Sequence, residues 1–482
     1  MTSMRPIIAV VIAASLLCGA CATRPINPPI TQVDAKSGYR FLTRAQHFKD
    51  RQNMVILAFS GGGTRAAAFS YGVLEALRPL VVVGQRGSIR MLDEVDVVTG
   101  VSGGSFTALA YGLYGEKLFD IYETSFLKRN VQGELIRRVL SPAHWGDWTR
   151  SETAAELYDE ILFHGATFAD LDRGDGPMVI ASATDISTGA RVGFVQGLFD
   201  FLCSDLDAVP LSRAATASSA VPFAFAPVTL NNYGGTCHFT LPPFLTIFKD
   251  PATAPRPAAR VLSHLRDVES YEDSAHRPYI HLVDGGLSDN LGMRGVLEVL
   301  DELEALSSLG LPNPLESVRR IVMFVVNSRS DPKTNWDTSE RPPSELALLI
   351  KATGVPIDHY SFETVETLRD KIAHWQTMRR LRESAAFAAN KDPAAAQLLR
   401  TPDIDLYAID VSFAALQDAK EREYLNNLPT SFVLPPEAVD RLRAAAKRIV
   451  LDSPDFKRLL KDVGARMVER PVDGAPRAPS AD

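Results

Sequence analysis

Residues 95–112 read VDVVTGVSGGSFTALAYG, and this stretch indicates the fold class. Residues 95–101 are an almost continuous apolar run, which is typical of a strand buried on both faces of a parallel sheet. The residues from Ser105 to Gly112 favour a helix. The stretch therefore predicts a strand and a helix joined by a tight, Gly-rich turn around Ser102.

The turn places Ser102 at the centre of a G-x-S-x-G motif. The motif alone is weak evidence, but a strand–turn–helix context is that of a nucleophile elbow, which exposes the serine Oγ at the end of the strand. The N-terminal amides of the helix would also favour negative charge at that point. We interpret Ser102 as a candidate nucleophile, although a serine that only caps the helix remains an alternative. The glycines that permit the turn are Gly100, Gly103 and Gly104.

A second join of a buried strand and a helix lies earlier in the chain, where VILAF (55–59) is followed by SGGGTRAAAF (60–69). Glycines allow consecutive backbone N–H groups to face one point and bind an anion. In a hydrolase the anion is the oxyanion, and in a nucleotide enzyme it is phosphate. No Gly-Lys-Ser/Thr follows, and Ala66 interrupts G-x-G-x-x-G, so the nucleotide motifs fail. The glycines concerned are Gly61, Gly62 and Gly63.

A third candidate is Asp284, which follows the strand-like run YIHLV (279–283) and precedes Gly285 and Gly286. Its carboxylate would lie at the end of an element, where catalytic groups are often found. An Asp before two glycines is also a common turn former, so this alternative remains open.

Further apolar runs predict strands at 177–185 and 320–328. Strands that alternate with helices predict an α/β fold with a central, mostly parallel sheet flanked by helices. From Pro342 onward the chain is expected to be mainly helical. One helix there carries an apolar stripe of Val365, Leu368, Ile372, Trp375 and Met378. The expected organisation is one catalytic domain over 49–466, with a surface insertion at 251–278 and a disordered tail at 467–482.

The first 20 residues have the features of a secretory signal: one Arg, an apolar run too short to span a bilayer, and small residues before Cys21. The site resembles a bacterial lipoprotein lipobox, although Cys18 stands where leucine is usual. Lipidation of Cys21 would anchor the protein stably, and Ala22 favours the outer membrane. Secretion with cleavage after Ala20 is the alternative. The Pro-rich residues that follow predict a semi-extended tether over 21–48.

Composition excludes some functions. The chain has 482 residues, a formal net charge of −7 and no block of Lys and Arg, which argues against a nucleic-acid partner. No HExxH motif occurs, and the acidic run at 172–176 is too short for an EF-hand loop, so we expect neither metal nor cofactor. Cys203 and Cys237 could form a disulfide or remain two buried thiols.

Taken in order, the three candidate segments resemble the patatin-like phospholipase family. The matching motifs are GGGTR (61–65), GVSGG (100–104) and DGG (284–286), supported by ASATDISTG (181–189), AATASSAVPFAFAPV (214–228) and a late segment, 409–434. The resemblance implies a patatin-like fold and a serine lipid acyl hydrolase of phospholipase A or esterase type. Its substrate would be phospholipid or another lipid ester, and its catalytic unit a Ser-Asp dyad without histidine.

Carried over by motif, Ser102 is the nucleophile and Asp284 takes its proton, while amides of residues 61–63 hold the oxyanion and Arg65 supports their loop. A free Asp is a weak base, with a pKa of about 3.9, and partial desolvation would raise that pKa. The family usually has glycine where this chain has Ala66. Three alternatives remain: a triad completed by His359, a general esterase or thioesterase, and a catalytically silent lipoprotein that binds lipid or a partner.

Overall fold

The computed structural model describes residues 24–469. The gaps within this range are 49–51, 85–86, 142–148, 223, 248, 250–254, 256–257, 313–314, 316, 332–335, 341 and 389–399. The predicted signal, Cys21 and nearly all of the predicted C-terminal tail lie outside the described residues.

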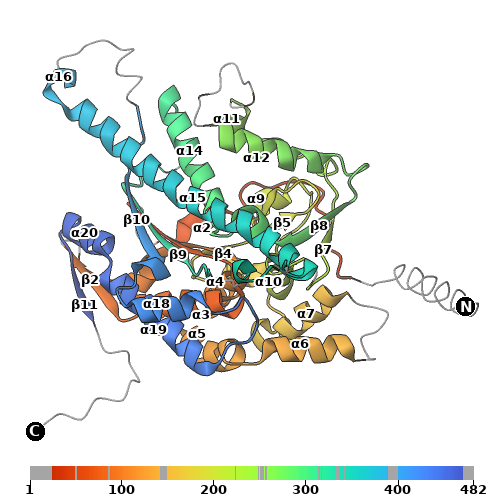
Figure 1. The fold of residues 1–482 in the computed structure, drawn as a ribbon. Coiled ribbons are helices and arrows are strands. Elements are labelled where there is room, and N and C mark those ends of the chain that lie inside the picture. Colours follow the sequence, from red (N-terminus) through yellow and green to blue (C-terminus); the bar gives the residue numbers. More distant parts are fainter. Residues whose placement is uncertain are drawn as a thin grey trace, which may run out of the picture.

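A mostly parallel sheet forms the centre of the protein (Figure 1). Within the described residues it has eight strands in the order β10-β9-β1-β4-β5-β8-β7, with β6 paired to β5. The strands are β1 (Asn53–Phe59), β4 (Val95–Val101), β5 (Met178–Asp185), β6 (Arg191–Gly193), β7 (Val228–Asn231), β8 (Tyr279–Asp284), β9 (Arg320–Asn327) and β10 (Asp405–Ser412). Strands β10, β9, β1, β4 and β5 pair in parallel, whereas β8 runs antiparallel to β5 and β7.

Strands of this sheet form at all four apolar runs of the sequence, 55–59, 95–101, 177–185 and 320–328. They are β1, β4, β5 and β9, as the α/β prediction requires. A separate three-stranded sheet contains β2 (Leu80–Gly84), β3 (Gly87–Arg90) and β11 (Arg466–Glu469).

Helices cover both faces of the central sheet (Figure 1). On one face lie α3 (Gly63–Leu77), α4 (Gly103–Tyr114) and α19 (Pro436–Asp452), and on the other α14 (Arg294–Leu309) and the long α15 (Glu345–Glu383). In the described parts of the chain, the other helices of eight or more residues are α6 (Val131–Leu140), α7 (Arg150–Tyr158), α10 (Leu211–Ser218), α12 (Ala259–Glu269), α18 (Ala419–Asn426) and α20 (Pro454–Asp462).

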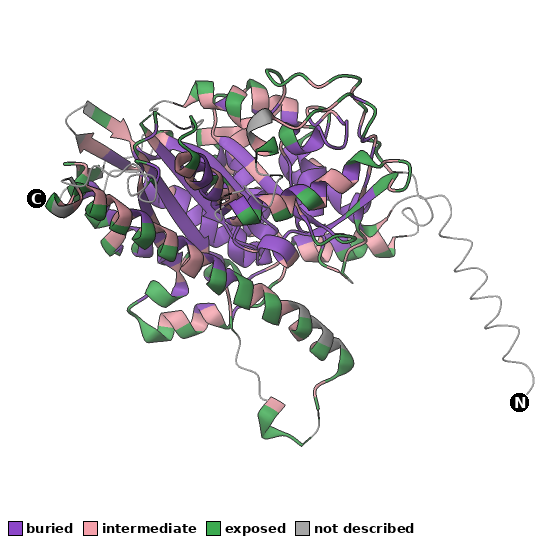
Figure 2. Cartoon of the chain, turned by 90° about the horizontal axis from the view of Figure 1, so that it is seen from above, coloured by how far each residue is buried: buried purple, intermediate pink, exposed green. Residues whose placement is uncertain are grey.

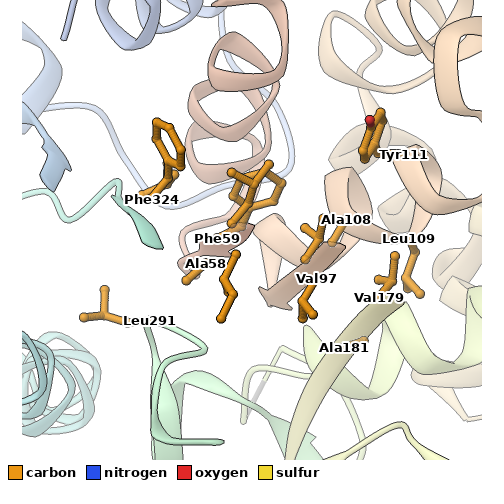
Figure 3. Close-up of a cluster of buried hydrophobic side chains, with 14 of the residues drawn as sticks. Ala58, Phe59, Val97, Ala108, Leu109, Tyr111, Val179, Ala181, Leu291 and Phe324 are labelled. Carbon is orange, nitrogen blue, oxygen red and sulfur yellow. The ribbon is translucent and has the colours of Figure 1, made fainter. Parts of the chain in front are cut away.

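The core lies between the sheet and these helices, where the buried residues gather (Figure 2). One part of the core gathers side chains from four adjacent strands, for example Phe59, Val97, Val179 and Phe324, and Leu109 of helix α4 lies in the same cluster (Figure 3). All of residues 54–59 and 95–101 are buried, which explains their continuous apolar sequence. The core thus fixes the strands whose ends carry the candidate site.

The C-terminal part is mainly helical, as predicted, and it also contributes two strands that were not predicted. Strand β10 forms the edge of the central sheet, and β11 belongs to the small sheet. The long helix α15 confirms the predicted stripe, since Leu368 and Trp375 are buried. The insertion at 251–278 contains helix α12, which packs through Val261, Leu265 and Val268.

The Pro-rich segment after Cys21 lies against the domain, although its sequence predicts a tether. Asn27 is only 2% exposed and exchanges hydrogen bonds with the backbone of Asn231, at 2.8 and 2.9 Å. The N–H of Ile30 donates to the carbonyl of Cys203 at 2.9 Å. The segment is therefore part of the folded domain from its first described residues. Cys203 itself forms a disulfide with Cys237, which decides between the two alternatives for these cysteines.

Candidate active site

Two strand–helix joins meet at one edge of the central sheet. Strands β1 and β4 are parallel neighbours, with Phe59 paired to Gly100, so the turns that follow them lie side by side. The first turn leads into α3 and the second into α4. The carboxyl ends of adjacent parallel strands are where α/β folds place ligand sites, and both predicted motifs are found there.

Ser102 occupies the elbow between β4 and α4 in a backbone conformation that non-glycine residues rarely adopt, with φ of 49° and ψ of −121°. The glycine after it cannot carry a side chain, because a Cβ on Gly103 would lie 2.0 Å from the carbonyl oxygen of Gly63. A Cβ on Gly104 would lie 2.6 Å from the oxygen of Ser60. These close approaches explain the G-x-S-x-G spacing and confirm the predicted turn.

Asp284 reaches the same place from a strand that runs in the opposite direction. Residue 284 ends β8 and pairs with Ala183 of β5, one residue beyond Ser182, which pairs with Val101. Its backbone N–H donates to Ala220 at 3.0 Å, and its Oδ1 accepts from the N–H of Gly286 at 2.8 Å. The sheet register therefore brings the carboxylate level with Ser102.

The Asp284 carboxyl is buried, and burial raises its pKa from 3.8 to about 6. Hydrogen bonds with the N–H of Gly286 and with the Ser102 side chain oppose the rise. The side chains of Ser102 and Asp284 thus interact, and the carboxyl has a proton affinity closer to neutral pH than that of a solvated Asp.

Both side chains line one cavity of about 570 Å³, a volume in the range of small-ligand pockets. Its walls come from the Gly-rich loop, the turn after β8, the segment after β9, the first half of α15 and Thr430. Its lining includes Gly61, Gly62, Arg65, Val221, Pro222, Leu287, Asn290, Arg329, Trp336, Lys351, Ile357 and Asp358.

The Gly-rich loop differs in one respect from the prediction that its three amides face an oxyanion. The N–H of Gly61 already donates to the carbonyl of Asn290 at 2.9 Å, so it holds the loop to the turn after β8. Among the described residues no acceptor is found for the N–H groups of Gly62 and Gly63. Both have positive φ, 138° and 59°, which glycine adopts without strain. These two amides remain the candidates for an anion site.

Arg65 is buried in the first turns of α3 and holds other segments to the Gly-rich loop. Its Nε and Nη1 donate to the carbonyls of Ser328 and Leu428, each at 2.8 Å, and its Nη2 donates to Thr430 Oγ1 at 3.1 Å. Burial lowers its pKa to about 10, so it stays charged at neutral pH. Ala66 is a fully buried residue of helix α3 and lies outside the turn.

The structure adds residues that the motifs do not contain. The hydroxyl of Ser218 accepts from the N–H of Ser102 at 2.9 Å and donates to the carbonyl of Ser182 at 2.7 Å, which fixes the elbow. Asn290 limits the space beside Gly61, where a Cβ would lie 2.6 Å from its Oδ1. Ser218 belongs to the family-like stretch 214–228, which is the one sequence signal that could have marked it.

None of the histidines that the structure describes lines the cavity. His359 is an exposed residue of α15 and is not among the residues that line the cavity. His281 is exposed and contacts Thr229 through Nδ1 at 2.9 Å, and His374 lies 3.6 Å from a carboxylate oxygen of Glu304. Within the part of the chain that the structure describes, no cluster of three or more His, Cys, Asp and Glu side chains is placed to hold a metal ion.

Comparison with solved structures gives matches at low identity. The human GIVD cytosolic phospholipase A2 shares 14% identity at a TM-score of 0.39, and the match covers 88% of this chain and 65% of that enzyme. This chain thus spans slightly less than two thirds of the human enzyme's length. VipD from Legionella pneumophila shares 10% identity at a TM-score of 0.28, and the match covers 94% of this chain and 74% of VipD.

No curated protein matches the chain in sequence. A family model described as patatin-like phospholipase matches residues 57–297, which is half of the chain and includes both turns and Asp284. The chain therefore belongs to the patatin-like phospholipase family.

Proposed function

We propose that the protein is a serine lipid acyl hydrolase of phospholipase A or esterase type that uses a Ser-Asp dyad. The observation that carries the proposal is the pairing of Ser102 in a strained elbow with a buried Asp284 of raised pKa, in one cavity. Perturbed carboxyls in a cleft next to a hydroxyl nucleophile are typical of active sites.

In the proposed reaction, Ser102 Oγ attacks the ester carbonyl carbon while Asp284 takes the hydroxyl proton. The oxyanion is held by the amides of Gly62 and Gly63. The C–O bond to the alcohol then breaks, the alcohol leaves with the proton from Asp284, and an acyl-enzyme forms on Ser102. Water attacks the acyl-enzyme, gives its proton to Asp284, and releases the fatty acid as the proton returns to Ser102.

Apolar surface near the cavity supports a lipid substrate. Val221 lines the cavity and is 40% exposed. Leu348 and Val355 lie on the half of α15 that lines it, and they are 47% and 39% exposed. Exposed apolar side chains around a cleft are suited to contact with a lipid surface.

We also propose that the mature chain is a lipoprotein held to the bacterial envelope through Cys21, as its N-terminal sequence suggests. In the described residues no helix combines the length and apolarity needed to cross a bilayer. Globomycin treatment of cells that express the full chain tests this proposal, because a lipoprotein accumulates as an unprocessed precursor and an ordinary secreted protein does not.

The activity is tested by measuring fatty acid release from phosphatidylcholine vesicles and turnover of a short-chain p-nitrophenyl ester. The proposed lipid hydrolase releases fatty acid from the vesicles, and the Ser102→Ala variant does not. Turnover of the short ester alone would favour a general esterase. Absence of both activities in folded protein would favour a silent lipid-binding lipoprotein.

A further inference from the structure

The wall of the cavity formed by the segment after β9 and by α15 carries opposite charges that the proposed dyad does not use. Arg329 follows β9, while Lys351 and Asp358 belong to the first half of α15. The Nε of Arg329 lies 3.2 Å from Asp358 Oδ1. Burial raises the pKa of Asp358, and the nearby charges of Arg329 and Lys351 oppose this rise, so the three groups lie close together.

The cavity is more cationic than the protein around it. Arg65, Arg329 and Lys351 line it, together with the carboxyls of Asp358 and Asp284. The whole chain has a formal net charge of −7. A concentration of cations in the cleft of an acidic protein favours an anionic group on the ligand.

The cations differ in what they can offer a ligand. Three N–H groups of Arg65 are bound to protein oxygens, so its main role is to connect segments. The side chain of Arg329 is 39% exposed, and among the described residues no acceptor is found for its two Nη groups. Lys351 is partly exposed on the same wall. Arg329 and Lys351 are therefore the cations that can reach a bound anion.

We propose that Arg329 and Lys351 form a phosphate subsite that selects acyl esters carrying a phosphodiester head group over neutral esters of the same acyl chain. The inference rests on the proposed hydrolase and names its substrate class. The guanidinium fork of Arg329 binds two phosphate oxygens, and the Lys351 ammonium adds a point charge. Asp358 holds Arg329 in place until the phosphate arrives. A phosphate fixed on this wall restrains the attached glycerol ester near Ser102.

The kinetic test compares dihexanoyl phosphatidylglycerol with dihexanoylglycerol, because the two differ only in the head group. In the Arg329→Gln variant, kcat/KM for the phospholipid is expected to fall about tenfold, the cost of one charge-assisted contact, with little change for the neutral ester. Lys351→Gln should also lower the ratio of kcat/KM for the phospholipid to kcat/KM for the neutral ester. Arg329→Lys should restore part of the ratio that Arg329→Gln loses. Arg369→Gln, on an exposed part of α15, is the matched control and should leave the ratio unchanged. Equal losses on both esters would overturn the inference.

A binding test separates this inference from the proposed catalysis. Calorimetry with the Ser102→Ala protein measures binding of the same phospholipid without turnover, and adding Arg329→Gln should weaken it about tenfold. If the wild type hydrolyses neither ester but this weakening is seen, the hydrolase proposal fails and the phosphate subsite stands. If Arg329→Gln leaves binding unchanged, the subsite is wrong. Inorganic phosphate alone serves as the probe for a free anion, and binding of phosphate without the phospholipid would overturn the assignment to a lipid.

Discussion

At the scale of single residues, Asp284 combines two effects of burial. Desolvation raises its pKa to about 6, which makes the ionised carboxylate a better proton acceptor than a solvated Asp. The same desolvation makes the ionised form costly in the folded state. The residue that serves the proposed chemistry should therefore also limit stability at neutral pH.

The first prediction concerns the pH dependence of activity. Only the ionised Asp284 can take the proton of Ser102, so kcat/KM should rise with pH through about 6 and then reach a plateau. The measurement is kcat/KM for a soluble short-chain ester from pH 4.5 to 8, with folding checked by circular dichroism at each pH. A profile whose midpoint stays near the ordinary Asp value would contradict the assignment of Asp284 as the base.

The second prediction concerns stability. Because burial raises the folded-state pKa of Asp284 from 3.8 to about 6, its ionised form destabilises the folded protein at pH 7 by about 3 kcal/mol. This cost is relieved as the pH falls through 6 towards 4. Asp284→Asn should therefore raise the free energy of unfolding at pH 7, with a difference that disappears near pH 4, and should abolish turnover. Urea denaturation at the two pH values measures this, and a variant less stable at pH 7 would count against the pKa shift.

The sequence revealed Ser102 and Asp284 because the glycines around them leave a visible pattern. The pattern does not mark Ser218, which reaches the site from helix α10 through a hydrogen bond to Ser102. Nor does it mark Asn290, which follows Asp284 by six residues and packs against the Gly-rich loop. It also suggested three equivalent oxyanion donors. Only the folded chain shows that the Gly61 amide is bound to the carbonyl of Asn290.

At the scale of elements, the site depends on how closely the starts of α3 and α4 approach each other. The Cα of Gly103 lies against the carbonyl of Gly63, where a Cβ would come within 2.0 Å. Both ends of this contact are backbone, so a side chain cannot be accommodated by a rotamer change. The packing of the two helices, rather than the turn alone, requires glycine at position 103.

The third prediction follows from this contact. Gly103→Ala should force α3 and α4 apart, lower the free energy of unfolding by more than 2 kcal/mol, roughly the cost of overpacking, and remove activity. Gly197→Ala is the matched control, since no atom lies within 4 Å of its Cβ position. Thermal unfolding and ester turnover of both variants provide the comparison. A Gly103→Ala protein as stable as the control would refute the close approach.

Inner and edge strands differ in how well sequence predicts them. The inner strands β1 and β4 are buried on both faces, so their sequences are continuous apolar runs that stand out. Strand β10 lies at the edge, and buried and partly exposed residues alternate along its last five positions. Its sequence has no apolar run as long as those of β1 and β4 and it follows a long helix, which explains why β10 was missed within a part of the chain that is otherwise helical as predicted.

At the scale of the whole molecule, the N-terminal segment is a structural part of the domain. Its Pro-rich, polar sequence predicts a tether because its composition contains little to bury. The structure shows that its polar groups are instead bound by the backbone of other segments, as for Asn27 with Asn231. Under the proposed lipidation of Cys21, few residues would separate the anchor from the folded domain, so the domain would be held close to the membrane.

The fourth prediction tests whether the N-terminal segment is bound to the domain. Asn27→Ala removes three hydrogen bonds from a buried side chain and should lower the free energy of unfolding by about 2 kcal/mol. Lys36→Ala, in an exposed turn of the same segment, should have little effect. Differential scanning calorimetry of the two variants makes the comparison. Equal stabilities would mean that the segment is a free tether after all.

The central claim, a serine activated by Asp284 without histidine, is tested most directly by fluorophosphonate labelling of the full chain in detergent. The wild type and the exposed-histidine variant His359→Ala should be labelled at equal rates, whereas Ser102→Ala and Asp284→Asn should lose labelling while remaining folded. Loss of labelling in folded His359→Ala would contradict the dyad and indicate a triad. A folded wild type that takes no label would contradict the activated serine itself.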